Sequence, residues 1–128
     1  SLNEVLDALI FSYVDWVSEQ PQFAKFLMLA HFRVMQSEHR DTLNEKNKLR
    51  NRKIITSISA YSNVDLLKSV PSELVMSLVI GATESYCRVW LSKKVVTSPK
   101  NYREILAKAA WDSLQNLADD LKINQKGE

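Results

Sequence analysis

Glycine and proline are scarce in this chain, which has two glycines and three prolines among its 128 residues. All-β and strand-alternating folds need these residues in their turns, so the scarcity argues against them. Collagen-like and low-complexity chains are excluded for the same reason. The length fits one domain, and a hydrophobic content of 45% is enough to build a core. The composition therefore predicts a single all-α domain.

Cysteine and histidine are also rare, and recognised catalytic motifs are lacking. Cys87 is the one cysteine, which excludes an internal disulfide and indicates a buried free thiol in a reducing, cytoplasmic compartment. His31 and His39 are eight residues apart with no carboxylate at ligand spacing, so we expect no metal site. Because the chain has no phosphate-binding loop and no activated nucleophile, we expect no cofactor and no enzymatic activity.

Charge and hydropathy give no sign of a nucleic-acid or membrane partner. The net charge is +2, and no run approaches the ~18 apolar residues of a membrane span. Segment 40–53 is more basic, with six basic and two acidic residues. It lacks interleaved aromatic residues, so we interpret it as a solvated helix face and not as a DNA contact.

Apolar residues recur at helical spacing in five segments, which are 2–20, 22–36, 41–62, 72–93 and 99–122. Pro21, Pro71 and Pro99 stand where the second, fourth and fifth helices begin, as is usual for proline in a first helical turn. Segment 22–36 carries two apolar stripes, so we expect it to be covered on two sides.

Segment 72–93 has an apolar arc of about 220°, against the ~100° of an ordinary surface helix. Segment 99–121 has a narrower apolar arc with small residues beside it. One core of this size does not easily cover both, so we predict a two-fold homodimer that joins these two segments in a four-helix interface. The residues predicted at the contact are Val79, Tyr86, Trp90, Ala109, Ser113 and Asn116.

Three stretches, YVDWVSEQPQFAKFLMLAHF, PSELVMSLVIGATESYCRVWLS and ILAKAAWDSL, carry a family resemblance. A helix is followed by an EQP break and an aromatic-rich helix. A proline-initiated helix then contains Gly81 and ends in Arg88 and aromatic residues. The last helix has an Ala-Ala-Trp-x-x-Leu run from Ala109 to Leu114. Over about 2–121 the chain resembles the C-terminal domain of TetR-family transcriptional regulators.

The resemblance implies a five-helix bundle that binds a small effector and dimerises through its last two helices. It also implies an N-terminal helix-turn-helix domain, which this sequence lacks. Because the chain begins within a helical pattern, we expect a fragment that folds and dimerises without binding operator DNA. The expected protein is a repressor released from DNA by a mostly apolar ligand. The alternative is a stand-alone helical protein-interaction module.

We expect the effector pocket between 2–20, 22–36, 41–62 and 72–93. The candidate lining residues are Tyr13, Trp16, Met28, His31, Phe32, Met35, Asn47 and Tyr61. For the stripe beside His31 we favour a hydrogen-bonded core histidine, or a surface that docks the absent domain, over a pocket lining. For the two tyrosines and Trp16 we favour core packing over a pocket wall. Asn47, Arg50 and Asn51 would form a polar pocket mouth if their stripe faces inward. We favour solvation for them because lysines and arginines surround them.

Overall fold

The computed structural model describes residues 1–59 and 70–126, and within them the chain is helical with no strand. The all-α prediction is confirmed. The elements are α1 (Leu2–Glu19), α2 (Pro21–Met35), α3 (Arg40–Ser59), α4 (Ser72–Leu91), the 3-10 helix η2 (Pro99–Tyr102) and α5 (Arg103–Lys126). Their bounds agree closely with the five predicted segments.

Local sequence signals explain where several helices begin. The Ser1 hydroxyl accepts a hydrogen bond from the backbone N–H of Glu4 at 3.3 Å and caps α1. Pro21 occupies the first turn of α2, as predicted. Ser98 accepts from the backbone N–H of Lys100 at 3.3 Å, but the turn that follows is η2, and α5 begins only at Arg103. The predicted fifth helix therefore starts as a tighter turn.

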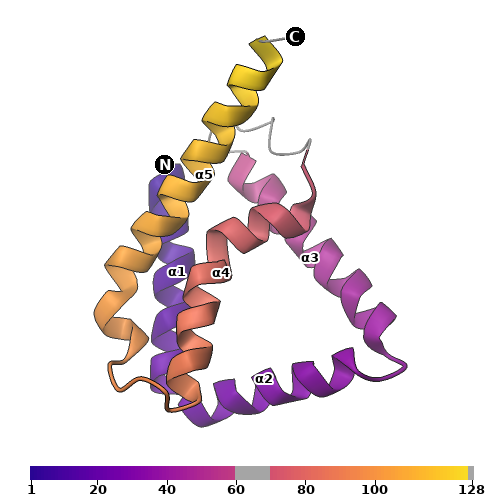
Figure 1. The fold of residues 1–128 in the computed structure, drawn as a ribbon, viewed down its shortest axis with the longest axis vertical. Coiled ribbons are helices and arrows are strands. Elements are labelled where there is room, and N and C mark those ends of the chain that lie inside the picture. The colour runs from indigo at the N-terminus through magenta and orange to yellow at the C-terminus, as the bar shows by residue number, and fades with distance from the viewer. Residues whose placement is uncertain (60–69, 127–128) are drawn as a thin grey trace.

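The main core lies where α1, α4 and α5 pack side by side (Figure 1). Leu6, Ile10 and Val14 of α1 are fully buried and contact a cluster that includes Val75 of α4 and Leu114 of α5. A second, smaller cluster forms where α2 leaves α1. Its buried members are Val17, Ala24, Cys87 and Leu91. These two clusters confirm the single buried stripe expected on α1.

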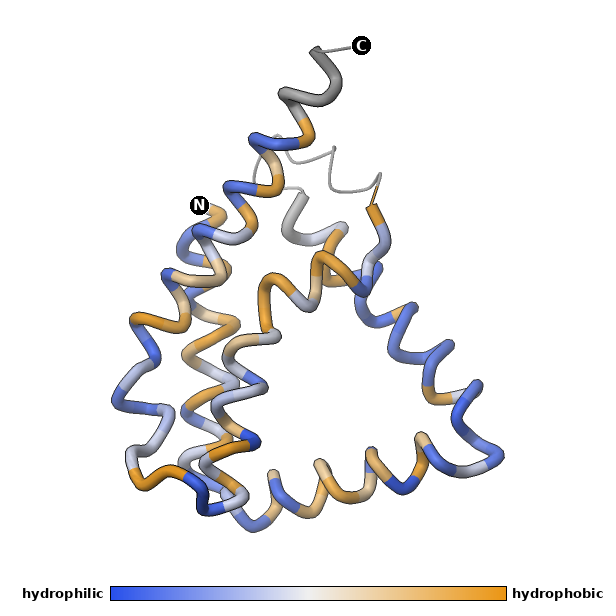
Figure 2. The backbone as a smooth tube through the Cα atoms, viewed as in Figure 1, coloured by the Kyte–Doolittle hydropathy of each residue, from blue (hydrophilic) through white to orange (hydrophobic). Residues whose placement is uncertain are grey.

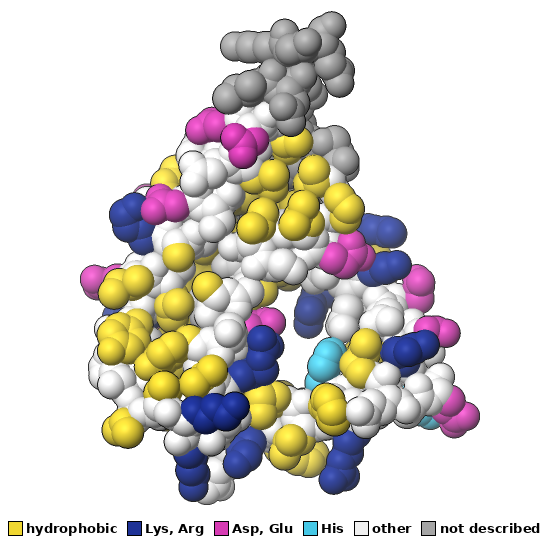
Figure 3. Space-filling model, in the orientation of Figure 1, with side chains coloured by type: hydrophobic (Ala, Val, Ile, Leu, Met, Phe, Trp, Pro, Cys, Tyr) yellow, Lys and Arg dark blue, Asp and Glu magenta, His cyan; other side chains and the backbone are white. Residues whose placement is uncertain are grey.

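Away from this core, α2 and α3 extend outward and form an open frame with α4 (Figure 1). α2 contacts α1 and α4 near its start and α3 near its end. The tube in Figure 2 is mostly hydrophilic along α3, in contrast to the hydrophobic stretches of α1 and α4. The space-filling view shows an opening through the molecule between α2, α3 and α4 (Figure 3).

The expectation that α2 is covered on two sides is wrong for the described residues. Ala24 is its one buried residue, whereas Phe26 and Phe32 are 63% and 59% exposed. The physical reason is the mostly polar α3, which touches α2 little and has no broad apolar face to lay over it. An apolar helix surface is left open to solvent in the single chain.

By length and composition alone, α4 is long and apolar enough to cross a membrane, and about a third of its apolar stretch (33%) is buried in the fold. The core helices of soluble proteins can be as long and as apolar, so this is weak evidence for a membrane span. Here the buried residues of α4 pack into the core with α1 and α5.

Candidate functional site

The broad apolar arc of α4 divides into a buried stripe and an open one. The buried stripe consists of Val75, Val79, Thr83, Cys87 and Leu91. A second stripe, whose members are four, four and seven residues apart, lies on another side of the helix and stays accessible. Leu74 is 45% exposed, Ala82 is exposed, and Leu78 and Val89 are half-buried. The core therefore uses only part of the apolar arc.

A matching stripe begins at the end of η2 and runs along α5 beside the buried alanines of that helix. Tyr102 and Ile105 are 38% and 67% exposed, Ala109 and Ser113 are half-buried, and Asn116 is exposed. The two stripes together make the surface called here the α4–α5 face. Its members are Leu74, Leu78, Ala82, Val89, Tyr102, Ile105, Ala109, Ser113 and Asn116. Figure 3 shows hydrophobic side chains gathered over α4 and α5.

An aromatic contact joins α4 to η2, the turn that precedes α5. The rings of Tyr86 and Tyr102 meet edge to face with their centroids 5.5 Å apart. The Tyr86 hydroxyl donates a hydrogen bond to the carbonyl oxygen of Thr97 at 2.8 Å. These contacts hold the segment between α4 and α5 against α4, and they fix the relative placement of the two helices.

The predicted dimer residues divide between this face and the core. Ala109, Ser113 and Asn116 belong to the α4–α5 face, and Tyr86 borders it. Val79 is only 2% exposed and is packed in the protomer's own core, so its assignment to a contact surface is wrong. Trp90 packs against the second buried cluster. The reason for the error is that α4 buries its Val75–Val79 side against α1 and α5.

The candidate effector residues on α2 lie along two sides of that helix. Ala24, Met28, His31 and Met35 share one stripe at spacings of four, three and four. Because Ala24 is buried and both methionines are half-buried, this stripe faces inward, although His31 within it is exposed. Phe32 is turned away from the centre of the stripe and is 59% exposed.

Tyr13 and Trp16 lie at the corner where α1, α2 and α4 meet. Their ring centroids are 6.3 Å apart, and Trp16 makes an edge-to-face contact with Phe23 at 6.1 Å. Both pack against the second buried cluster, so the core-packing alternative describes them. Burial raises the pKa of Tyr13 to about 12, and the charge of Glu84 adds to the shift. The Tyr13 hydroxyl therefore stays protonated. Tyr61 lies outside the described residues.

The side of α3 that is turned away from solvent, called here its inner face, is polar. Most of this face was not predicted from the sequence. Asn44 and Asn47 are half-buried, Asn51 is 9% exposed, and Ile55 is 6% exposed. Solvation of Asn51 was the favoured expectation and is wrong, whereas Arg50 is exposed as expected. The inner face is rotated from the predicted Asn47–Arg50 stripe because Ile55 packs into the main core. The Asn-x-x-Asn-x-x-x-Asn spacing is the signal that would have found it.

Asn51 has an unusual environment. Its side-chain oxygen Oδ1 is buried and has no hydrogen-bond partner. Buried polar atoms are nearly always paired, because an unpaired one has lost its bonds to water without replacement. Asn51 Oδ1 is thus a buried hydrogen-bond acceptor without a donor, on the inner face of α3.

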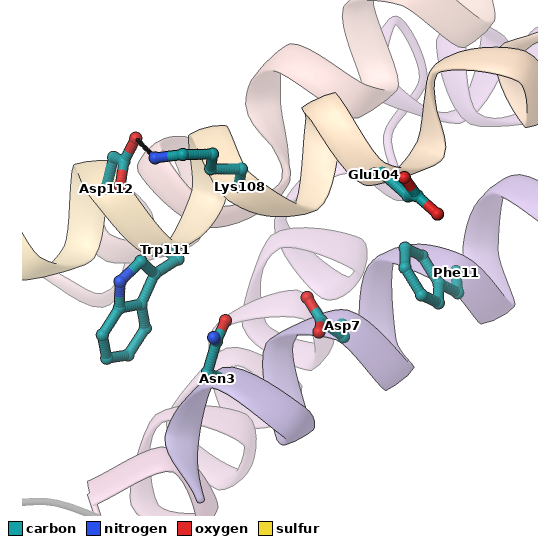
Figure 4. Close-up of a pocket in the computed structure, with 7 residues that line it drawn as sticks. All are labelled: Asn3, Asp7, Phe11, Glu104, Lys108, Trp111 and Asp112. Carbon is teal, nitrogen blue, oxygen red and sulfur yellow. Dashed lines mark hydrogen bonds and ion pairs between the residues drawn. The ribbon is translucent and has the colours of Figure 1, made fainter.

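Two surface hollows lie elsewhere. A groove of about 600 Å³ runs along the surface where α1 and α5 meet. In it, Asp7 and Phe11 of α1 lie opposite Glu104 and Lys108 of α5 (Figure 4). Within it, Lys108 Nζ is 2.7 Å from Asp112 Oδ2. A second hollow of about 460 Å³ lies between α3 and the start of α4. The lining of neither hollow includes a predicted effector residue.

Within residues 1–59 and 70–126, no group of three or more His, Cys, Asp or Glu side chains is placed to hold a metal ion. The chain matches no protein-family model and no curated protein. The arguments for function therefore come from the α4–α5 face and from the frame formed by α2, α3 and α4.

Proposed function

We propose that this chain is the effector-sensing and dimerisation domain of a TetR-like bacterial transcriptional regulator. The observation that carries the proposal is the α4–α5 face. It extends over two adjacent helices and includes Ile105 at 67% and Leu74 at 45% exposure. Contiguous apolar surface of this kind marks an interaction site more often than a solvated one.

A second copy of the same face is the occupant that fits it best. Two helices from each protomer, related by a two-fold axis, form a four-helix interface in which the same stripe meets itself. The small side chains of Ala109 and Ser113 permit close helix approach. The charged residues of α5, among them Lys108 and Asp112, lie on a different side and would stay in water.

Sedimentation velocity at micromolar concentration tests the assembly. We expect the wild-type chain to sediment as a dimer and Ala109→Arg and Asn116→Arg to sediment as monomers. Gln115→Arg is the matched control, since Gln115 is exposed next to Asn116 but points to the charged side of α5. If the wild-type chain sediments as a monomer, the predicted dimer is wrong and the proposal loses its main support.

Effector sensing is proposed for the opening between α2, α3 and α4. Met28 and Met35 offer flexible apolar contact there, and His31 offers a polar group. A ligand that prefers one placement of α2 would shift a conformational equilibrium by its differential affinity, typically about 1–3 kcal/mol. In the intact cytoplasmic regulator this shift would release the repressor from operator DNA, which a helix-turn-helix domain outside residues 1–128 would bind.

A thermal-shift screen of apolar and amphipathic compounds tests this second part. Compounds that raise Tm are tested again on His31→Ala and Met28→Ala, with Phe26→Ala as the control on the exposed side of α2. We expect the first two variants to weaken binding and the control to leave it unchanged. Equal binding to all three variants would remove α2 from the effector site.

The exposed surface of α2 favours a second candidate function, that of a stand-alone protein-interaction module. Phe23, Phe26 and Leu29 are each more than half exposed. A helix with such side chains suits a partner's groove. The sedimentation experiment and the compound screen together distinguish the two functions. A chain that is monomeric and binds none of the screened compounds favours the protein-interaction module.

A further inference from the structure

The buried amide of Asn51 indicates what kind of effector the opening accepts. Asn51 lies on the one side of α3 that is turned away from solvent, in line with Asn44 and Asn47. The lysines and arginines of the same helix are on its exposed side. A helix that only packed on α4 would carry apolar residues at these inner positions. Here three amides replace them.

This row of amides ends at a core contact. Ile55, one turn after Asn51, belongs to the main core, and Asn47, one turn before it, is half-buried. Along α3, Asn51 thus lies between a core residue and a half-buried one, and α3 borders the opening that Figure 3 shows between α2, α3 and α4. Its Oδ1 has no partner, so a hydrogen-bond donor that arrives from the opening restores a bond that folding removed.

The uncharged amides of Asn44, Asn47 and Asn51 along α3 favour a neutral ligand. On α2, the half-buried Met28 and Met35 are uncharged as well. A buried acceptor beside apolar side chains selects for a donor group on an apolar body.

Resting on the proposed effector-sensing function, we infer that Asn51 Oδ1 accepts a hydrogen bond from the effector, and that the effector is a neutral compound with an N–H or O–H donor on an apolar body. A compound of the same shape without the donor leaves Oδ1 unpaired and binds less tightly. A charged compound is disfavoured because it gives up hydration, and the Asn51 amide offers it no counter-ion.

Three probes with the same alkyl chain separate these cases: octanamide, which has N–H donors, methyl octanoate, which has none, and octanoate, which is charged. Isothermal titration calorimetry on the full chain should show octanamide binding about tenfold more tightly than methyl octanoate. In Asn51→Leu this preference should disappear while methyl octanoate still binds. Asn101→Leu, at an exposed position of η2, is the matched control and should keep the preference.

Each other outcome overturns the inference in a recognisable way. Equal binding of amide and ester to the wild-type chain removes the role of Asn51 but leaves effector binding in place. A preference that survives Asn51→Leu does the same. Tightest binding by octanoate overturns the neutral class, and no binding by any probe overturns the ligand class. The proposed function is then judged by its own sedimentation and screening tests.

A measurement without ligand completes the test. Because Asn51 has no internal partner for Oδ1, Asn51→Leu should raise the Tm of the free chain. A Tm lower than that of Asn101→Leu would show that the Asn51 amide is paired within the protein, and the inference would fall.

Discussion

One guanidinium nitrogen of Arg103, Nη1, donates hydrogen bonds to both carboxylate oxygens of Asp15, at 3.2 and 3.1 Å. The same guanidinium lies 4.7 Å from the centroid of the Phe11 ring. The two contacts join the first turn of α5 to α1 through an ion pair and a cation–π interaction. They hold the end of α5 that precedes the α4–α5 face.

Arg103→Ala should therefore lower the free energy of unfolding by about 1 kcal/mol, a value that allows for the partial exposure of both side chains. Arg103→Lys should recover less than half of the loss, because an ammonium does not reproduce the flat guanidinium over the ring. Lys108→Ala is the control, since the Lys108–Asp112 pair is more exposed, and it should cost less than about 0.5 kcal/mol. Urea unfolding measures all three, and equal losses at both sites would contradict the argument.

Alkaline pH should destabilise the fold. Burial raises the pKa of the Cys87 thiol from 9.0 to about 11 and that of Tyr13 from 10.0 to about 12. In the unfolded chain both groups ionise near their ordinary pKa values, so between pH 9 and 12 the folded state binds more protons. The contribution of these two groups to the free energy of unfolding should then be constant below pH 9 and fall above it.

Cys87→Ala separates the two groups. Without the thiol, the fall should begin near pH 10, where unfolded Tyr13 ionises, rather than near pH 9. The shape of the stability curve is compared, since the substitution also changes its level. An unchanged onset in Cys87→Ala would mean that the thiol does not contribute to the pH dependence.

The helix positions were predictable because local residues set them. Pro21 and Ser98 determine helix starts through backbone geometry and capping, and these effects do not depend on the rest of the fold. The stripe from Leu6 to Val14 likewise identifies the buried side of α1 at once. Each of these signals depends only on residues that are close together in the sequence.

The placement of one helix against another was less predictable. The apolar content of α2 indicates burial, yet whether a partner covers Phe26 depends on the distant α3. On α3, lysines and arginines surround both Arg50 and Asn51, and only the packing of Ile55 decides which of them faces inward. Val79 was misplaced for the same reason: a wide apolar arc does not say which part the protomer itself buries.

Two substitutions in α2 test whether its apolar surface is open in solution. Phe26 is 63% exposed, so Phe26→Ser should change the free energy of unfolding by less than about 0.5 kcal/mol. Ala24 is 5% exposed in the second buried cluster, so Ala24→Asp should cost about 3 kcal/mol or more by burying an unpaired carboxylate. Urea unfolding gives both values. A loss above about 1 kcal/mol in Phe26→Ser would show that Phe26 is covered in solution.

Gly81 lies at the middle of α4, a helix that bends along its length in Figure 1. Nothing within 4 Å would meet a Cβ built at this position, and its φ is not in the left-handed region. Glycine inside a helix costs about 0.5–1 kcal/mol relative to alanine, chiefly through the conformational entropy of the unfolded chain. Gly81→Ala should therefore raise the free energy of unfolding of the protomer by about that amount.

The outcome also bears on the dimer, because Gly81 is adjacent along the helix to Ala82 of the α4–α5 face. Urea unfolding at several protein concentrations separates the two effects, since only dimer stability depends on concentration. If Gly81→Ala stabilises the chain equally at all concentrations, no second chain contacts Gly81. If it stabilises the dilute chain but weakens the dimer seen in sedimentation, the added methyl group lies against a partner helix. Destabilisation at every concentration would contradict the open space beside Gly81.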